Sequence, residues 1–399
     1  MKVCFETFGC RLNRAEALEM ESRFLARGWT RTERHDDADL IVVRGCSVTA
    51  RAERDCMRLV EHIRRKYPLK RVVVTGCMRE KRNEQWLKSL DGDNAPVPTR
   101  TARAYLKVQD GCSGQCSFCI VPRFRGRASS VPLDEVVGKA MRFADAGYGE
   151  IVVTGCSLTQ YADGAKRLPD LVAALADAVP ECRIRLGSVE PVAVAGEVVH
   201  AMAERRNVCR FLHIPVQSGS TRILAAMRRP YRAKDVESLV HEAVSLMPGL
   251  GLGCDLMSGF PDETDNDHLA TLALVNRLPF TNAHVFAFSE RPGTVAAALP
   301  NPVPKEVRSA RAHELSSAAR AKRALYAKRF KGREVEIVVE DGKTLSGWTS
   351  EYLWCQVGRE KAGVFEKIRR MRNEGSMRKS LLSITVREVR GDILTGDPA

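Results

Sequence analysis

Three cysteines in one short loop constrain this chain more than any other feature. Cys112, Cys116 and Cys119, here named the loop triplet, stand in DGCSGQCSFC with the spacing C-x3-C-x2-C, directly after an apolar strand-like run. Three thiolates on one tight loop can bind three irons of a four-iron cluster and leave the fourth iron open to a small molecule. The alternatives are three free thiols or a zinc site, which would need a fourth ligand from elsewhere in the chain.

A second set of cysteines, the N-terminal triplet, is spread over three separate segments. Cys10, Cys46 and Cys77 each follow a predicted strand, in TFGC, VRGC and VTGC. In a parallel sheet the carboxyl ends of the strands share one edge, so these three thiols are predicted to converge on one metal. Each cysteine taken singly is more typical of a small buried hydrophobic residue.

The alternation of apolar runs and helical segments predicts an α/β chain. Residues 1–95 read as a small parallel sheet covered by helices, and 100–300 as six strand–helix units that form either a parallel barrel or an open doubly wound sheet. Residues 301–331 read as a basic helical connector. Short alternating strands at 332–399 predict a small antiparallel β-barrel.

Charge and cysteine content indicate which binding partners and which cellular compartment suit this chain. The chain has 63 basic and 49 acidic residues, a net charge of +14, which favours a polyanionic partner, nucleic acid before an anionic membrane surface. No apolar stretch is long enough to cross a membrane and no signal peptide is evident, so we expect a cytoplasmic protein. Thirteen cysteines then favour metal or redox chemistry over a disulfide framework.

The two triplets and the segments around them resemble the radical S-adenosylmethionine methylthiotransferase family. The segments are TFGCRLNRAEALEMES, GCSVTARAE, VVVTGC, QDGCSGQCSFCIVPRFRGR, HIPVQSGSTRILAAMRRPY, DLMSGFPDET and FSERPGT. The resemblance implies a partial (βα)6 barrel and a tail similar to the TRAM domain. The opening segment and MRRPY most resemble the branch that methylthiolates threonylcarbamoyladenosine beside the tRNA anticodon. Other branches act on isopentenyladenosine in tRNA or on an aspartate of a ribosomal protein.

The resemblance also implies the cofactors and partners. One [4Fe-4S] cluster on the loop triplet would reduce S-adenosylmethionine to a carbon radical, and a second [4Fe-4S] cluster on the N-terminal triplet would carry the sulfur. A radical is needed because the hydrogen on carbon 2 of adenine is neither acidic nor a leaving group, and a cofactor supplies that chemistry. The implied partners are tRNA, an electron donor and a sulfur source, and the sequence identifies neither donor.

Three polar residues are candidates for contacts with S-adenosylmethionine. Glu150 matches the acidic position that the superfamily uses for the methionine amine, and a carboxylate suits an ammonium group. Ser188 and Gln217 lie at predicted strand ends that face the mouth of the barrel. The alternative for Glu150 is a solvated turn residue, and for Ser188 and Gln217 a hydrogen-bonding role within a turn.

Two basic segments are candidates for RNA contacts. PRFRGR contains Arg123 and Arg127, and MRRPYR contains Arg228 and Arg229. Clustered guanidinium groups suit phosphates, although a solvated charged surface is the ordinary alternative. In the tail, Tyr352 and Trp354 are two residues apart, which predicts a shared strand face that serves as a stacking platform or as core.

Two features depart from the family pattern. Arg44 and Gly45 precede Cys46 where the family generally has Asn-Thr, and a short segment between Cys77 and Cys112 predicts a truncated N-terminal domain. A function of another class also stays open. A non-catalytic RNA-binding protein with structural metal sites would explain the charge and the tail, but not the open loop triplet.

Overall fold

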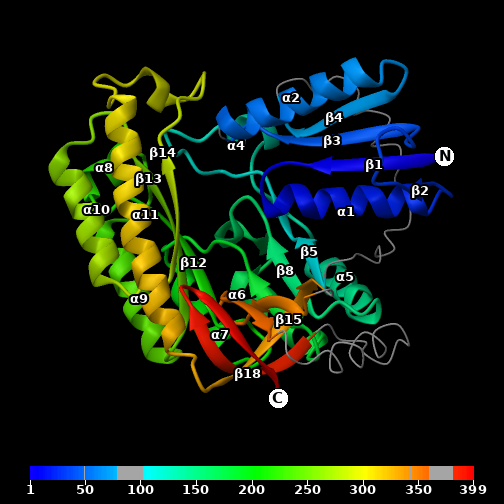
Figure 1. Cartoon of the computed structure of the whole chain (residues 1–399). Coiled ribbons are helices and arrows are strands. Elements are labelled where there is room, and N and C mark those ends of the chain that lie inside the picture. Colours follow the sequence, from blue (N-terminus) through cyan, green and yellow to red (C-terminus); the bar gives the residue numbers. More distant parts are fainter. Residues whose placement is uncertain (49, 79–101, 342–343, 359–380) are drawn as a thin grey trace.

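The structure is a computed structural model that describes residues 1–48, 50–78, 102–341, 344–358 and 381–399. Figure 1 shows an N-terminal α/β unit, a central set of strands with helices outside it, and a C-terminal β-barrel beneath the central strands. The predicted fold class is confirmed: the main sheets of the first two units are parallel and the C-terminal barrel is closed. The boundary predicted between residues 95 and 100, and most of the short segment between Cys77 and Cys112, fall at 79–101, outside the described residues.

The N-terminal unit is a four-stranded parallel sheet of order β2-β1-β3-β4. Its elements are β1 (Lys2–Thr7), α1 (Arg11–Leu25), β2 (Thr30–Arg31), β3 (Leu40–Cys46), α2 (Ala50–Lys66) and β4 (Arg71–Cys77). Every residue of β3 is buried, as expected of a β-branched strand covered on both faces. The sheet therefore brings the carboxyl ends of β1, β3 and β4 to one edge.

The central unit contains six parallel strands in two groups, β11-β8-β5 and β12-β13-β14. They are β5 (Arg103–Lys107), β8 (Glu150–Thr154), β11 (Arg183–Leu186), β12 (Phe211–Gln217), β13 (Gly251–Ser258) and β14 (Asn282–Ala287). Isolated bridges, Ile184 to Val208 and Ser188 to His213, join the two groups. In the described part of the chain β5 and β14 do not pair, so the six strands form a partial barrel.

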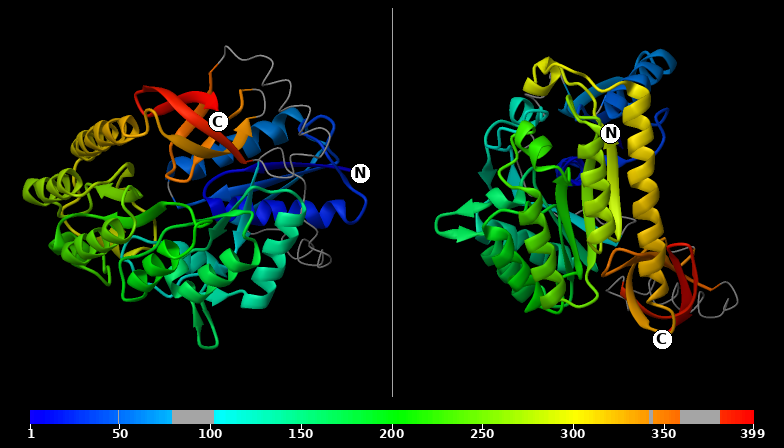
Figure 2. Two further views of the ribbon diagram at one scale, coloured as in Figure 1. Left: turned by 90° about the horizontal axis from the view of Figure 1, so that it is seen from below. Right: turned by 90° about the vertical axis from the view of Figure 1, so that its left-hand side faces the viewer.

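Helices cover the outside of this barrel and bury the largest apolar core of the molecule against it. They are α5 (Leu133–Asp145), α6 (Leu168–Ala178), α7 (Val194–Ala203), α8 (Thr221–Ala226), α9 (Ala233–Leu246), α10 (Asp265–Arg277) and α11 (Lys305–Lys328). The short helix α4 (Val121–Arg125) instead contacts β4 of the N-terminal unit. The long helix α11 lies along β14 and descends to the C-terminal barrel, as the right-hand view of Figure 2 shows. It is the basic connector that the sequence predicts. No helix in the described ranges is both long and apolar enough to span a bilayer.

The first helix occupies part of the open side of the partial barrel. Ala15 of α1 lies in one buried cluster with Tyr105 of β5 and Val152 of β8. Those two side chains belong to the inner face of the barrel, so α1 fills the interior beside β5 and β8 (Figure 1). The N-terminal unit is therefore built into the barrel rather than attached to its outside.

The C-terminal barrel has the strand order β15-β16-β17-β19-β18. Its strands are β15 (Glu334–Asp341), β16 (Ser346–Thr349), β17 (Trp354–Val357), β18 (Leu381–Arg390) and β19 (Ile393–Pro398). The pairing is antiparallel except between β17 and β19, which are parallel. The predicted antiparallel barrel is thus correct in outline, with one parallel closure.

The expectation that Tyr352 and Trp354 share a strand face is wrong. Tyr352 lies in the turn between β16 and β17 with φ of 67°, and only Trp354 is in a strand. The Tyr352 ring stacks on Trp348 at 4.4 Å between centroids and lies 4.8 Å from the ring of Phe211. The turn therefore directs this ring against Phe211 of the central barrel and not onto a strand face shared with Trp354.

Candidate active site

The loop triplet lies beyond the carboxyl end of β5 and is held there by backbone contacts to a distant segment. The amide of Ser117 donates to the Met227 carbonyl at 3.0 Å, and its hydroxyl donates to the Ala226 carbonyl at 2.9 Å. A Cβ on Gly114 would lie 3.2 Å from the Cys112 sulfur and 3.9 Å from the Cys116 sulfur. The absent side chain thus leaves a cradle between two thiols, which fits a bound cluster.

Hydrogen-bond donors point at two of these three sulfurs. The Gln160 side-chain amide donates to Cys112 Sγ at 3.4 Å, and Arg229 Nη1 donates to Cys116 Sγ at 3.0 Å. Burial raises the pKa of Cys119 to about 12, with smaller contributions from the neighbouring thiols. A bound cation is what converts such buried thiols to thiolates, so the donor set fits an iron–sulfur cluster.

The N-terminal triplet converges as predicted from the topology. Cys46 and Cys77 are direct partners at the ends of β3 and β4. Cys10 precedes α1, and its neighbour Gly9, at φ of 97°, comes so close to Cys46 that a Cβ would lie 2.5 Å from the Cys46 Cβ. Burial raises the pKa of Cys46 to about 11, and the charges of the other two cysteines add to this. Three sulfurs from distant segments are therefore gathered at one sheet edge.

Gly45, one of the two departures from the family pattern, has a packing reason here. A Cβ at this position would lie 2.4 Å from the Met78 side chain and 2.9 Å from the Cys56 sulfur. The other departure, Arg44, is buried and forms an ion pair with Glu16 of α1. Both residues thus fit the packing directly behind the N-terminal triplet.

Arg125 connects the two triplets, a role that the sequence reasoning missed. It lies in α4, six residues after Cys119, and its Nε donates to Cys77 Sγ at 2.9 Å. Its Nη1 donates to Glu16 of α1 and to Asp110, each at 2.9 Å. Burial opposes ionisation of Glu16, but Arg125, Arg44 and Lys107 hold the pKa of its carboxyl well below the usual range. In the sequence Arg125 lies between Arg123 and Arg127 in PRFRGR, a cluster that suggested phosphate contacts and gave no sign of a cysteine partner.

The assignment of Arg229 to RNA binding is wrong. Its side chain is only 5% exposed, and each of its three nitrogens has a partner. Besides the bond to Cys116, Nη2 pairs with Glu190 at 2.6 Å and Nε donates to the Tyr231 hydroxyl at 2.7 Å. A buried guanidinium that donates to a cysteine of the loop triplet is a supporting group of that site. The neighbouring Arg228 is exposed and stays a candidate for RNA.

Glu150 is not near the loop triplet. It is paired with Arg103 at the amino end of β5, whereas the triplet follows the carboxyl end, four residues or about 13 Å further along the strand. Its carboxylate is fully buried and accepts from Arg183 at 2.7 Å and from Arg185 at 2.7 and 2.9 Å. Burial opposes the charge, but these arginines hold the pKa of Glu150 well below its usual range. A methionine amine cannot reach it, so the expected cofactor contact is wrong.

A different carboxylate lies beside the loop triplet. Glu190 follows β11, two residues after Ser188, and its second oxygen lies 3.4 Å from the hydroxyls of Ser157 and Thr159. Its first oxygen pairs with Arg229, as described above. Glu150 lies at the start of β8, at the opposite end of the parallel strands from Glu190.

The remaining candidates lie where the predicted strand ends place them. Ser188 is exposed just beyond β11, and Gln217 is half-buried as the last residue of β12, with φ of 65°. In the other basic segment, Arg127 is exposed, and Arg123 Nη1 lies 3.4 Å from the Pro292 carbonyl. None of these four makes a contact with a cysteine of either triplet among the described residues.

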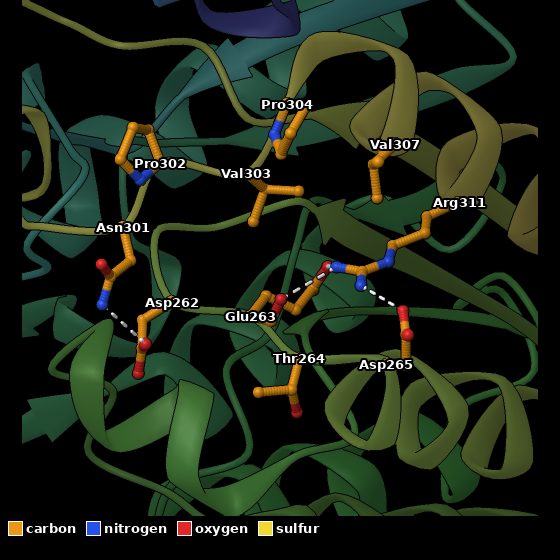
Figure 3. A pocket seen from close by; sticks show the side chains of 10 residues that line it. All are labelled: Asp262, Glu263, Thr264, Asp265, Asn301, Pro302, Val303, Pro304, Val307 and Arg311. Atoms are coloured by element: carbon orange, nitrogen blue, oxygen red, sulfur yellow. Dashed lines mark hydrogen bonds and ion pairs between the residues drawn. The ribbon is translucent and has the colours of Figure 1, made fainter.

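A separate hollow of about 370 Å³ lies outside the barrel, between the loop after β13 and the start of α11 (Figure 3). Arg311 donates to Glu263 at 2.7 Å and to Asp265 at 2.6 Å across it. It contains no residue of either triplet, and its charges are already paired. We therefore assign the site to the two triplets.

Comparisons with known proteins agree with this site. A model of the radical SAM superfamily matches residues 106–275, and one described as the uncharacterized protein family UPF0004 matches residues 2–95. A tRNA-2-methylthio-N(6)-dimethylallyladenosine synthase from Chlorobium limicola is 30% identical, over 92% of each chain. A threonylcarbamoyladenosine tRNA methylthiotransferase MtaB from Thermotoga maritima is also 30% identical, over 92% of this chain and 94% of the relative.

A solved structure is similar in fold. It is the radical S-adenosylmethionine methyltransferase TsrM from Kitasatospora setae, with a TM-score of 0.55 and 15% identity over 74% of this chain and 77% of that one. This likeness concerns the fold, whereas the superfamily match and the two relatives place the chain among the S-adenosylmethionine-dependent transferases. The chain belongs to the radical S-adenosylmethionine methylthiotransferase family.

Proposed function

We propose that this enzyme adds a methylthio group to carbon 2 of threonylcarbamoyladenosine beside the anticodon of a tRNA. The observation that carries the proposal is the link between the segments of the two cysteine triplets, in which Arg125 from the loop-triplet segment donates to Cys77 of the other. A transfer that needs both a radical and a sulfur requires two such sites within reach of one substrate. The relatives named for this substrate also support it.

The loop triplet would hold one [4Fe-4S] cluster and S-adenosylmethionine on its open iron, and the N-terminal triplet a second [4Fe-4S] cluster. When bound, these groups supply the one-electron chemistry and the sulfur that no side chain of the protein can provide. Arg229 and Arg125 orient the cysteine ligands and place positive charge beside the sulfurs. Ser188 and Gln217 remain candidates for contacts with S-adenosylmethionine.

The exposed arginines Arg123, Arg127 and Arg228 would contact tRNA phosphates. They lie on the segments that also carry Arg125 and Arg229, so phosphate contacts would position the RNA beside the site. The net charge of +14 supports a polyanionic substrate. An electron donor and a sulfur source would come from other components of the cell.

A dimethylallyl-bearing adenosine in tRNA is the second candidate, because a relative named for that substrate is as similar as one named for the first. Nucleoside mass spectrometry separates them. We expect tRNA from cells that lack the protein to lose 2-methylthio-threonylcarbamoyladenosine and accumulate its unmethylthiolated precursor. The gene encoding the intact chain should restore the modification, and the Cys112→Ala variant should not. Loss of the methylthio-dimethylallyl nucleoside instead would support the second candidate and contradict the first.

A further inference from the structure

The inner face of the second strand group stays partly accessible to solvent at β13 and β14, unlike that of the first group. Val285 of β14 and Leu256 of β13 pack outward into the helical layer, so the alternate residues of these strands face inward. These include Asp255, His284 and Phe286. The His284 side chain is 49% exposed and Phe286 is 44% exposed. The barrel interior beside β14 is therefore open to a ligand.

The N-terminal unit adds two arginines to this interior. Arg11 Nη2 lies 3.4 Å from the Tyr352 hydroxyl, and Arg14 Nη1 donates to the Tyr105 hydroxyl at 3.1 Å. No carboxylate among the described residues lies within ion-pair distance of either guanidinium. Although burial opposes it, Arg11 and Arg103 lower the pKa of Tyr352. The two guanidinium charges on α1 are thus available to a ligand.

A histidine pair with a shared carboxylate lies on the same interior. Asp255 Oδ1 accepts from His213 Nε2 at 3.0 Å and from His284 Nδ1 at 3.2 Å. Burial would raise the pKa of Asp255, but the bonds from the two imidazoles hold it well below the usual range. Because Nδ1 of His284 faces Asp255, its Nε2 is left for a group on the exposed side. One carboxylate thus fixes the orientation of two imidazoles.

Aromatic rings join these two groups into one wall. The Tyr352 ring lies 4.8 Å from that of Phe211, Phe211 lies 6.3 Å from His213, and His213 lies 5.3 Å from His284. Arg11 begins this row, and the residue immediately before it belongs to the N-terminal triplet. The wall therefore starts beside the proposed sulfur-carrying site and ends at the exposed edge strand.

We propose that Arg11 and Arg14, one turn apart on α1, bind the carboxylate of an amino-acid substituent on the target base. The inference rests on the proposed function: a threonylcarbamoyl group ends in a carboxylate, whereas a dimethylallyl group is apolar. A guanidinium binds a carboxylate through two parallel hydrogen bonds, and the exposed rings of His284 and Phe286 offer flat faces to a base. The interior thus selects the acidic substituent over the apolar one.

A phosphate of the RNA backbone would present the same anionic oxygens to these residues. The two sources differ because every stem-loop carries phosphates and only one substituent carries the carboxylate. Binding should therefore be compared among four anticodon stem-loops of one sequence, with threonylcarbamoyladenosine, its methyl ester, dimethylallyladenosine or plain adenosine at the target position. The ester removes the charge and keeps the size.

The experiment uses the full chain with both clusters in place and no S-adenosylmethionine, so that binding is measured without turnover. We expect the acid to bind about tenfold more tightly than the ester and the other two stem-loops, the value of one lost charge-assisted bond. Arg11→Gln and Arg14→Gln should each remove most of that preference. Arg27→Gln, the same charge change beyond the far end of α1, should leave it intact.

Several outcomes would overturn the inference. They are equal binding of acid and ester by the unaltered protein, tighter binding of the dimethylallyl stem-loop, and an equal loss of affinity for all four stem-loops in the arginine variants, which would indicate phosphate contacts. Loss of the preference in EDTA would assign it to a metal ion on His213, Asp255 and His284 instead. If Arg11→Gln fails to fold, Arg14→Gln decides. The proposed function fails separately, through the nucleoside analysis.

Discussion

Buried networks of arginine and glutamate join the central barrel to both of its neighbours, yet the two networks end on different groups. At the carboxyl end of β5, Arg125 pairs with Glu16 of the N-terminal unit and ends on the Cys77 sulfur. At the amino end, Arg183 and Arg185 pair with Glu150 and end on backbone carbonyls of the C-terminal barrel, those of residues 336, 348, 349 and 350.

The difference shows that the same kind of ion pair, between an arginine and a glutamate, has two purposes in this molecule. A guanidinium that donates to a cysteine ligand acts on the electronics of the metal site. One that donates to main-chain carbonyls fastens two domains together and neutralises a buried acid. Substitutions of Arg125 should therefore affect the chemistry of the metal site. Substitutions of Glu150, Arg183 or Arg185, at the amino end of the barrel strands, should affect the stability of the protein.

The largest effect is expected from Cys112→Ala. A cluster that loses one thiolate loses its defined open iron, so reductive cleavage of S-adenosylmethionine to 5′-deoxyadenosine should disappear. The matched control is Cys355→Ala, which removes a buried sulfur from the C-terminal barrel core. The control should retain cleavage, measured by chromatography under anaerobic reduction. Undiminished cleavage in a folded Cys112→Ala protein would contradict the assignment of the loop triplet.

Glu150→Gln should show the second-largest effect, on stability. It leaves two buried guanidinium groups without their acid, which typically costs about 3–5 kcal/mol. Urea unfolding should shift to lower concentration, and limited proteolysis should release the C-terminal barrel sooner. Binding of S-adenosylmethionine should survive in the folded fraction. Unchanged stability together with lost cofactor binding would reverse the comparison and restore Glu150 to the cofactor site.

Arg125→Gln tests the network that ends on the Cys77 sulfur. Removal of a charge-assisted donor from Cys77 should lower the reduction potential of the second cluster, by about 60 mV if the bond contributes about 1.4 kcal/mol. Redox titration followed by electron paramagnetic resonance measures this. Arg125→Lys, which keeps the charge, should recover part of the shift. Arg229→Gln should lower the potential of the other cluster instead, and a shift of the same cluster by both variants would argue against two independent sites.

The smallest effect is expected from Arg228→Gln. This residue neighbours Arg229 in the sequence but is exposed, so its loss should remove one phosphate contact without altering either cluster. The plot of log affinity for tRNA against log salt should flatten by about 0.7–0.9. Titrations at four or more salt concentrations would measure the slope. An unchanged slope would assign Arg228 to the solvated surface.

The sequence alone was sufficient for what depends on local spacing and strand order. The loop triplet lies within eight residues, so its spacing already specifies one shared site. The N-terminal triplet follows from a general property of parallel sheets, which places strand ends at one edge. The α/β class follows from the alternation of apolar periods along the chain, because burial requires that pattern whatever the final packing.

Only the tertiary structure decided which charged residue serves which site. Arg229 and Arg228 are adjacent in sequence, yet one donates to a cysteine 113 positions away and the other faces solvent. The register of β5 against β8 places Glu150 at the amino end of the strands. A turn with positive φ directs the Tyr352 ring toward Phe211 of the central barrel. The sequence shows the same arginine or glutamate whether the side chain supports the metal site, joins two domains or faces solvent. Its role depends on the partner that compensates its burial, and that partner is supplied by chain segments that only folding brings together.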